Sequence, residues 1–289
     1  MRKLIKSDRI FSVITIASAI MIPVICGLIL ASLLGGSIQA FESFGIFGFV
    51  SSSEWNVNPG NEHYGAFAFI VGTLYTTILA VLICIPLALP ISLFCGEYYK
   101  NSFLSKVLTT VTNLLAGIPS IIYGLWGFYA VRPLIIMLNM SEVGSGILTA
   151  SLVLALMIVP YAAGLSTEFI KMVPNDLKES AYSLGATRAE VIRTVIFPTA
   201  GAGIFSAFIL ATGRAIGETM TVTMLIGNTI NIPMLLTDTG NSMASIIANQ
   251  FGEADGLKLS SLIAVGLILF IITAIINFAG KMLIKRARI

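Results

Sequence analysis

An arginine and a glutamate stand four residues apart in an otherwise apolar stretch, GRAIGETMTVTMLIGN (Gly213–Asn228). The apolar run that holds them begins near Ala200, so Arg214 lies about 21 Å into a helix that rises about 1.5 Å per residue. An ionisable side chain at such a depth in a membrane is costly unless it faces protein or water. Because a guanidinium offers forked N–H donors that match the oxygens of an oxyanion, Arg214 is a candidate for an anion pathway.

Glu218 lies one helical turn beyond Arg214, on the same face of the expected helix. A permanent ion pair would let both side chains sit inside a packed bundle, and it would leave no net positive charge for an anion. In the functional interpretation, Glu218 is a switch partner of Arg214 and exchanges with the anion or with groups on a neighbouring subunit. The sequence leaves both interpretations of the pair open.

A second stretch stands out because it is polar: PNDLKESAYSLGATRAEVIRTVIFP (Pro174–Pro198). Apolar and small residues recur in it at helical spacing, namely Leu177, Ala181 and Leu184 in the first half and Ala189, Ile192 and Ile196 in the second. Asn175 or Asp176 is expected to cap the first helix, and Gly185 permits the left-handed backbone that ends it. Two short amphipathic helices joined by a bend are either a docking surface for a partner or a loop that lies on lipid headgroups.

The elements that must position these two stretches are apolar. Of the 289 residues, 56% are hydrophobic and only 11% are charged, whereas a soluble domain carries about 25% charged residues. This composition excludes a water-soluble domain and predicts an all-α integral membrane protein. The three cysteines lie in apolar runs without metal-ligand spacing, and the single histidine, His63, has no neighbouring ligand, so neither a metal site nor a cofactor is expected.

Six apolar runs predict six transmembrane helices in one domain. The first run is too long for the apolar region of a signal peptide, so it is expected to be a retained span. The expected order is a cytoplasmic N-terminus at 1–9, the first span at 10–34, an extracytoplasmic loop at 35–65, a core of five spans at 66–284 that includes a polar loop at 168–199, and a cytoplasmic tail at 285–289. The five core runs cover 66–95, 107–131, 145–165, 200–226 and 260–283.

The distribution of basic residues predicts the orientation of these spans. With the N-terminus in the cytoplasm, Arg132 and Lys258 fall outside and Arg214 lies within a span, so the remaining 14 of the 17 lysines and arginines lie inside. Cytoplasmic loops and flanks carry an excess of lysine and arginine. Both termini and the polar loop are therefore expected in the cytoplasm.

The polar stretch resembles the EAA loop of ABC importer permeases, written EAA-x3-G-x9-I-x-L-P. The matching positions are Glu179, Ala181, Gly185 and Pro198, and conservative departures stand at Ser180, Val195 and Phe197. The resemblance implies the six-helix type I ABC importer permease fold, in which this bend is the coupling helix and sits in a cleft of a cytoplasmic ATP-hydrolysing subunit. It also implies alternating access driven by that subunit, with Arg214 lining the path.

Further segments resemble the phosphate-specific branch of this family: GTLYTT (Gly72–Thr77), LAGIPSIIYG (Leu115–Gly124) and GRAIGET (Gly213–Thr219). The loop SEWNVNP (Ser53–Pro59) is closer to the PstC type of that branch than to the PstA type. The resemblance implies import of inorganic phosphate across a prokaryotic plasma (inner) membrane. It implies as partners a homologous permease of PstA type, two cytoplasmic ATP-binding subunits of PstB type and an extracytoplasmic phosphate-binding protein of PstS type.

The chain itself is not expected to be an enzyme. It contains no GxxxxGK[ST] sequence, so ATP hydrolysis must come from a partner. Three alternatives remain: a permease of the same architecture for sulfate or molybdate, a secondary anion transporter, and a membrane-embedded enzyme. A secondary transporter also binds its substrate near the membrane midplane, but it needs no docking surface for an ATPase. The enzyme is disfavoured because the spans hold no catalytic constellation beyond Arg214 and Glu218.

Overall fold

The structure is a computed structural model that describes residues 2–58 and 60–287, with the side chains of residues 11–58 and 60–285. The long helices are α1 (Arg2–Phe44), α3 (Phe67–Leu93), α7 (Ile147–Lys171), α10 (Phe197–Ile216) and α13 (Gly256–Ala287). The shorter α-helices are α2 (Ile46–Ser51), α4 (Phe103–Ala116), α5 (Ser120–Trp126), α6 (Arg132–Met137), α8 (Asn175–Ser183), α9 (Arg188–Val191), α11 (Met220–Leu225) and α12 (Met243–Gln250).

Three π-helical segments and one 3-10 turn continue these helices. They are the π-helical η1 (Phe94–Tyr98), η2 (Gly127–Val131) and η3 (Ile192–Ile196), and the 3-10 turn η4 (Phe251–Glu253). In the described part of the chain, six helical stretches are long and apolar enough to cross a membrane, which confirms the predicted number of spans.

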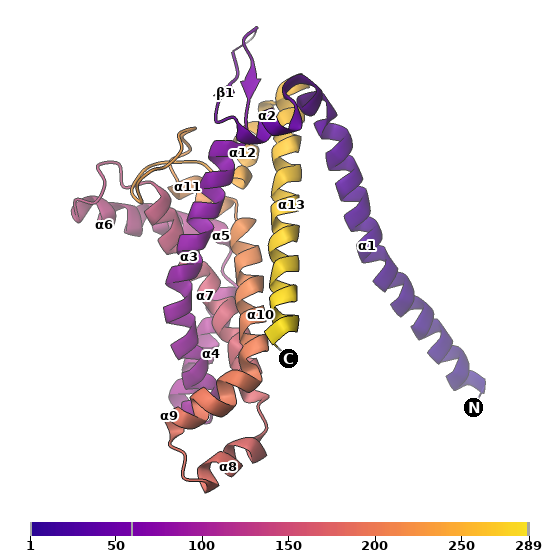
Figure 1. The fold of residues 1–289 in the computed structure, drawn as a ribbon, viewed down its shortest axis with the longest axis vertical. Helices are drawn as coiled ribbons and strands as arrows, with labels where there is room; N and C mark the ends of the chain where they lie inside the picture. Colours follow the sequence, from indigo (N-terminus) through magenta and orange to yellow (C-terminus); the bar gives the residue numbers. More distant parts are fainter. Residues whose placement is uncertain (1, 59, 288–289) are drawn as a thin grey trace.

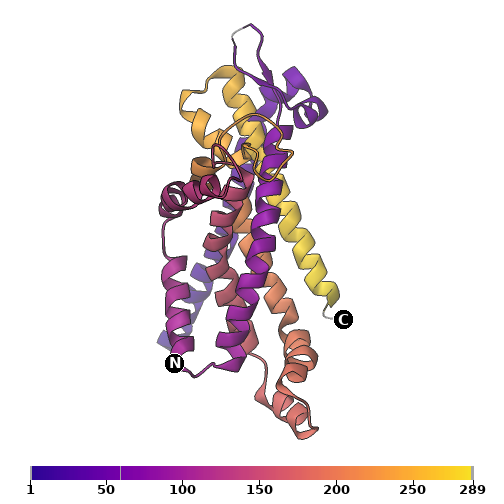
Figure 2. The same ribbon diagram turned by 90° about the vertical axis from the view of Figure 1, so that its left-hand side faces the viewer.

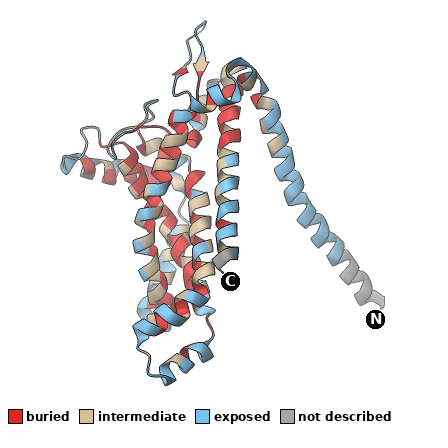
Figure 3. Ribbon diagram, in the orientation of Figure 1, coloured by how far each residue is buried: buried red, intermediate tan, exposed pale blue. Residues whose placement is uncertain are grey.

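The bundle is built around α7. Two-thirds of its most apolar window is buried (67%), and α3 and α10 pack against it (Figures 1 and 3). Hydroxyl side chains are tolerated in this apolar core because they bond to carbonyls of the preceding turn: Thr167 donates to Ala163 at 2.7 Å and Ser151 to Ile147 at 2.7 Å. Small residues let the helices approach closely. A Cβ at Gly72 of α3 would lie 2.0 Å from the carbonyl oxygen of Asn241.

The first helix stands apart from the bundle over its N-terminal half (Figure 1). Near its other end it packs on α13, where the Ser260 hydroxyl accepts from the Ala40 amide at 3.0 Å and donates to the Gly36 carbonyl at 2.8 Å. The helix runs on to Phe44, so the loop expected at 35–65 begins as helix. The contact with α13 accounts for this extension, since it supports a stretch whose glycines weaken helix propensity.

The rest of that segment forms α2 and a short hairpin. Strand β1 (Trp55–Asn56) pairs antiparallel with β2 (His63–Tyr64), with Trp55 opposite Tyr64. Both aromatic side chains are buried, Trp55 packs edge-on against Tyr64 and Phe69, and its indole donates to the amide oxygen of Gln250 at 3.0 Å. Figures 1 and 2 place this hairpin and the polar helices α8 and α9 at opposite ends of the bundle.

Two predicted spans are interrupted. The run at 107–131 breaks between α4 and α5 because Pro119 lacks an amide proton and disfavours a helical conformation at Ile118. The run at 200–226 breaks between α10 and α11, where Gly217 ends the first helix and Glu218 lies in the gap. Both breaks matter for the site.

Candidate functional site

The two interrupted spans meet each other. The hydroxyl of Thr221, at the start of α11, donates to the carbonyl of Ser120, at the start of α5, at 2.8 Å. The two short helices pack closely because position 124 is a glycine, whose Cβ would lie 3.1 Å from the Cα of Thr221. Non-helical backbone inside a membrane is tolerated where it is buried in protein or lines a cavity, and transporters place their sites at such breaks.

Arg214 lies on the last turn of α10, beside this junction, and its side chain is exposed. Its guanidinium carbon lies 4.3 Å from the centre of the Tyr161 ring on α7, a cation–π contact that orients the side chain. The Tyr161 hydroxyl donates to the carbonyl of Ala116 at 2.6 Å, and the Tyr123 hydroxyl to that of Leu115 at 2.9 Å. These bonds satisfy two of the free carbonyls at the end of α4.

Glu218 does not face Arg214. The helix ends at Ile216, so the expected one-turn spacing on a common face is lost, and no ion pair joins the two side chains in the described part. Glu218 is 9% exposed, and its carboxylate accepts from the Thr221 amide at 3.3 Å, at the start of α11. It borders a small void that is also lined by Thr76 of α3. The guanidinium of Arg214 therefore keeps its donors free of a carboxylate partner within residues 11–58 and 60–285.

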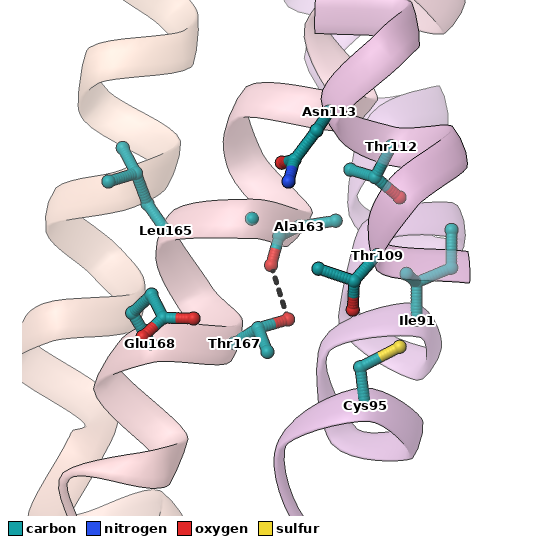
Figure 4. A pocket seen from close by; sticks show the side chains of 10 residues that line it. Ile91, Cys95, Thr109, Thr112, Asn113, Ala163, Leu165, Thr167 and Glu168 are labelled. Atoms are coloured by element: carbon teal, nitrogen blue, oxygen red, sulfur yellow. Dashed lines mark hydrogen bonds between the residues drawn. The ribbon is translucent and has the colours of Figure 1, made fainter. Parts of the chain in front are cut away.

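A cavity of about 170 Å³ with a mixed polar and apolar lining opens between α3, η1, α4 and α7 (Figure 4), and its α7 wall begins at Ala163, two residues after Tyr161. The side chains of Thr109 and Asn113 extend from α4 toward α7, where Thr167 and Glu168 line the opposite wall. Glu168 lies seven residues after Tyr161, on the same helical face. Its charge is balanced by Lys171, whose ammonium nitrogen lies 2.9 Å from the carboxylate.

The polar loop at 168–199 forms the predicted two helices and bend. Gly185 has φ of 86°, the left-handed conformation expected of it. The predicted cap of the first helix is wrong: Asn175 and Asp176 both lie inside α8, and Pro174 occupies the cap position without a side-chain hydrogen bond. Proline keeps the residue before it, Val173, out of the helical region, and Pro174 itself has an extended backbone, so α8 begins only at Asn175.

A capping box that was not predicted begins α9. Thr187 accepts from the amide of Glu190, and the Glu190 carboxylate accepts from the amide and hydroxyl of Thr187 at 2.7 and 2.8 Å. The signal is present in the sequence as T-x-x-E directly after Ala186. This box fixes where the chain resumes helical structure after the bend.

The two apolar stripes of the loop behave differently. In the second, Ile192 and Ile196 are buried against the bundle in a cluster that includes Ile170. In the first, Ala181 is half-buried against the same cluster, whereas Leu177 is 47% and Leu184 is 90% exposed, so both ends of this stripe are uncovered within the described residues. The loop is thus anchored to the bundle by its second half and projects an apolar surface with its first.

The positions that match the EAA pattern lie on or beside the projecting part. Glu179 and Gly185 are exposed and Ala181 is half-buried, all in or next to α8, whereas the exposed Pro198 lies in the first turn of α10. The structure also reveals a residue that no sequence signal indicated: Glu97 of η1 forms a buried ion pair with Lys178 of α8, 81 positions later in the chain.

Comparison with known proteins identifies relatives over nearly the whole chain. Over 305 residues, 40% of positions are identical to the phosphate transport system permease protein PstC of Mesorhizobium japonicum, covering 99% of this chain and 92% of that protein. The PstC protein of Pasteurella multocida is 39% identical over 287 residues, covering 93% of this chain and 88% of that protein. These relatives carry permease names, in agreement with the prediction that the chain is not itself an enzyme.

The fold has a solved counterpart. An inward-facing structure of the MetNI methionine ABC transporter matches with a TM-score of 0.61 at 19% identity, covering 76% of this chain and 96% of that chain. This match confirms the predicted type I ABC importer permease fold. The family model for binding-protein-dependent transport system inner membrane components matches residues 88–289. Together, the model match and the curated relatives show that this multi-pass membrane chain belongs to the family of binding-protein-dependent transport system inner membrane components.

Proposed function

We propose that the chain is one permease subunit of an ATP-driven importer of inorganic phosphate, and that Arg214 lies on the path of the anion. The observation that carries the site is the position of Arg214: its guanidinium stands beside two interrupted helices and has no carboxylate partner in the described chain. Phosphate as the substrate is supported by the names of relatives that match nearly the whole chain, in bacteria and in the archaeon Methanocaldococcus jannaschii.

The geometry supports this path at Arg214 and in the cavity that follows Tyr161. The guanidinium binds two oxygens of phosphate through its fork while its face stays stacked on Tyr161. From there, the hydroxyl of Thr109 and the amide of Asn113, in the cavity whose α7 wall follows Tyr161, offer donors to the departing anion. Glu218 is the switch partner: it rests on the Thr221 amide in this conformation and meets Arg214 when the gap between α10 and α11 rearranges.

The polar loop is the site of ATPase coupling in this proposal. Its exposed residues Leu177, Tyr182 and Leu184 present an apolar surface, and apolar surface left uncovered on a protein marks an interaction site. The proposed coupling residues are Glu179, Ala181, Gly185 and Pro198. The excess of basic residues at this end supports a cytoplasmic location for it and for both termini.

The proposed assembly lies in a prokaryotic plasma membrane. It contains this chain, a homologous permease subunit of PstA type, two ATP-binding subunits of PstB type and an extracytoplasmic phosphate-binding protein of PstS type. The assignment of ATP binding to a separate subunit agrees with the lack of a phosphate-binding glycine loop in the sequence.

Uptake by the reconstituted assembly tests this function. The chain is purified with the subunits that accompany it from its native membrane and placed in vesicles with the binding protein. ATP-dependent accumulation of labelled phosphate, which excess sulfate or molybdate does not reduce, is the expected result. Accumulation without ATP would support a secondary transporter instead, and stronger uptake of sulfate or molybdate would replace phosphate as the substrate.

A further inference from the structure

The only buried residue of α8 is a lysine. The Lys178 side chain is 6% exposed, and its ammonium nitrogen lies 2.5 Å from the carboxylate of Glu97, which is 10% exposed. Two charges taken out of water are stable only as a pair, and the loss of one leaves the other buried without compensation. This pair is therefore sensitive to any movement of α8 relative to η1.

A second contact joins the same two parts of the chain from the other side of the bend. Arg188, the first residue of α9, donates to the carbonyl of Glu97 at 3.2 Å and to that of Tyr98. Its guanidinium carbon lies 4.4 Å from the centre of the Tyr98 ring. Both arms of the bend at Gly185 are thus fastened to η1, the π-helical continuation of α3.

The η1 segment is itself packed tightly on α7. A Cβ at Gly96 would lie 2.8 Å from a methyl carbon of Ile170 and 3.2 Å from the carbonyl oxygen of Thr167. Such close packing leaves η1 little room to yield locally, so a displacement of its end is passed along α3. The π-helical geometry fits this position, since π-bulges are frequent at functional sites.

The far end of α3 reaches the surroundings of Glu218. Thr73, Thr76 and Thr77 line the small void that Glu218 borders. Twenty residues of helix separate Thr77 from Glu97, which corresponds to about 30 Å at 1.5 Å per residue. The helix is continuous over this distance up to Leu93 and passes through η1 to Glu97. One helical element therefore connects the polar loop with the proposed switch residue.

We infer that Glu97 and Lys178 are a positioning pair that transmits movement of α8 to α3, and through α3 to the surroundings of Glu218. The inference rests on the proposed role of the polar loop in ATPase coupling. In the described structure α8 otherwise packs mainly on α9 and η3, which follow it in the chain. The ion pair is a direct side-chain connection from α8 to the first span of the core.

Coupling in the reconstituted importer tests this pair. Glu97→Gln, Lys178→Gln and the exchanged pair Glu97→Lys with Lys178→Glu are compared with wild type. The readout is the amount of phosphate imported per ATP hydrolysed, measured with subunit assembly and ATPase rate. We expect each neutral variant to assemble and hydrolyse ATP but to import at least tenfold less phosphate per ATP. The exchanged pair should restore at least half of the wild-type ratio.

Lys100→Gln is the matched control, because Lys100 is an exposed lysine three residues after Glu97 and takes part in none of the ion pairs of the described residues. Its ratio should equal that of wild type. Unchanged ratios in both neutral variants, or no recovery in the exchanged pair, would overturn the inference.

If the neutral variants do not assemble, the exchanged pair is the deciding variant. The inference is contradicted if its complex assembles and hydrolyses ATP normally but imports less than a tenth of the wild-type amount of phosphate per ATP. Wild-type uptake reports separately on the proposed function. If wild type transports a different anion, the same ratio is measured with that anion.

Discussion

Replacement of Arg214 by glutamine is the sharpest test of the anion path. The change preserves a hydrogen-bonding amide but removes the positive charge, the forked donors and the stacking on Tyr161. A hydrogen bond to a charged group contributes about 1.5–3 kcal/mol. Since each 1.4 kcal/mol is about a tenfold change, we expect ATP-dependent phosphate uptake to fall by about ten- to a hundredfold. Arg214→Lys, which keeps a point charge without the fork, should give an intermediate loss.

The assay is initial uptake in vesicles at equal amounts of inserted, assembled importer. Arg132→Gln is a matched control, because Arg132 also stacks on an aromatic ring, with its guanidinium carbon 4.6 Å from the centre of Phe128, but lies on α6, away from the junction. Its uptake should stay within about twofold of wild type, because Arg132 lies outside the proposed path and the assay compares equal amounts of assembled importer. Wild-type uptake by Arg214→Gln, with normal insertion, would refute the reasoning.

Three further predictions concern the bend, the apolar surface and the packing of α3. Gly185→Ala places an L side chain at φ of 86°, which costs about 1–2 kcal/mol. It should lower phosphate import per ATP, whereas Gly185→Asn should lower it less. Leu184→Asp puts a charge on a side chain that is 90% exposed, so insertion should be unchanged while co-purification of the ATPase is lost. Gly72→Ala sets a Cβ 2.0 Å from the carbonyl oxygen of Asn241. Such overpacking should lower the free energy of unfolding by about 1–3 kcal/mol, so the protein should unfold at a lower temperature in detergent.

The spans and the bend were predictable because their signals are local. An apolar run that is long enough predicts a membrane helix from its own residues. The left-handed conformation of Gly185 was predicted from the helical periodicity on both sides of it. The break before α5 also carried a local signal, since Pro119 stands inside an apolar run. For these elements, the physics that shapes the chain acts within a few residues.

The features that were not predicted depend on distant residues. The break after Ile216 is supported by the bond from Thr221 to Ser120, whose positions are 101 residues apart. Because the helix ends at Ile216, Arg214 and Glu218 do not share a helical face, and the ion pair that their spacing allowed does not form. Glu97 lies 81 residues before Lys178, and nothing in either local sequence indicates that they meet. Such pairings require the packing of whole helices to be known.

The separation of α1 from the bundle has a consequence for biogenesis. Its main long-range partner is α13, and the hydrogen bonds of Ser260 join positions 220 and 224 residues apart. Because α1 is synthesised first and α13 last, α1 lacks this packing partner until α13 is inserted into the membrane. A chain truncated before α13 therefore lacks the two hydrogen bonds of Ser260 that hold α1 against the bundle.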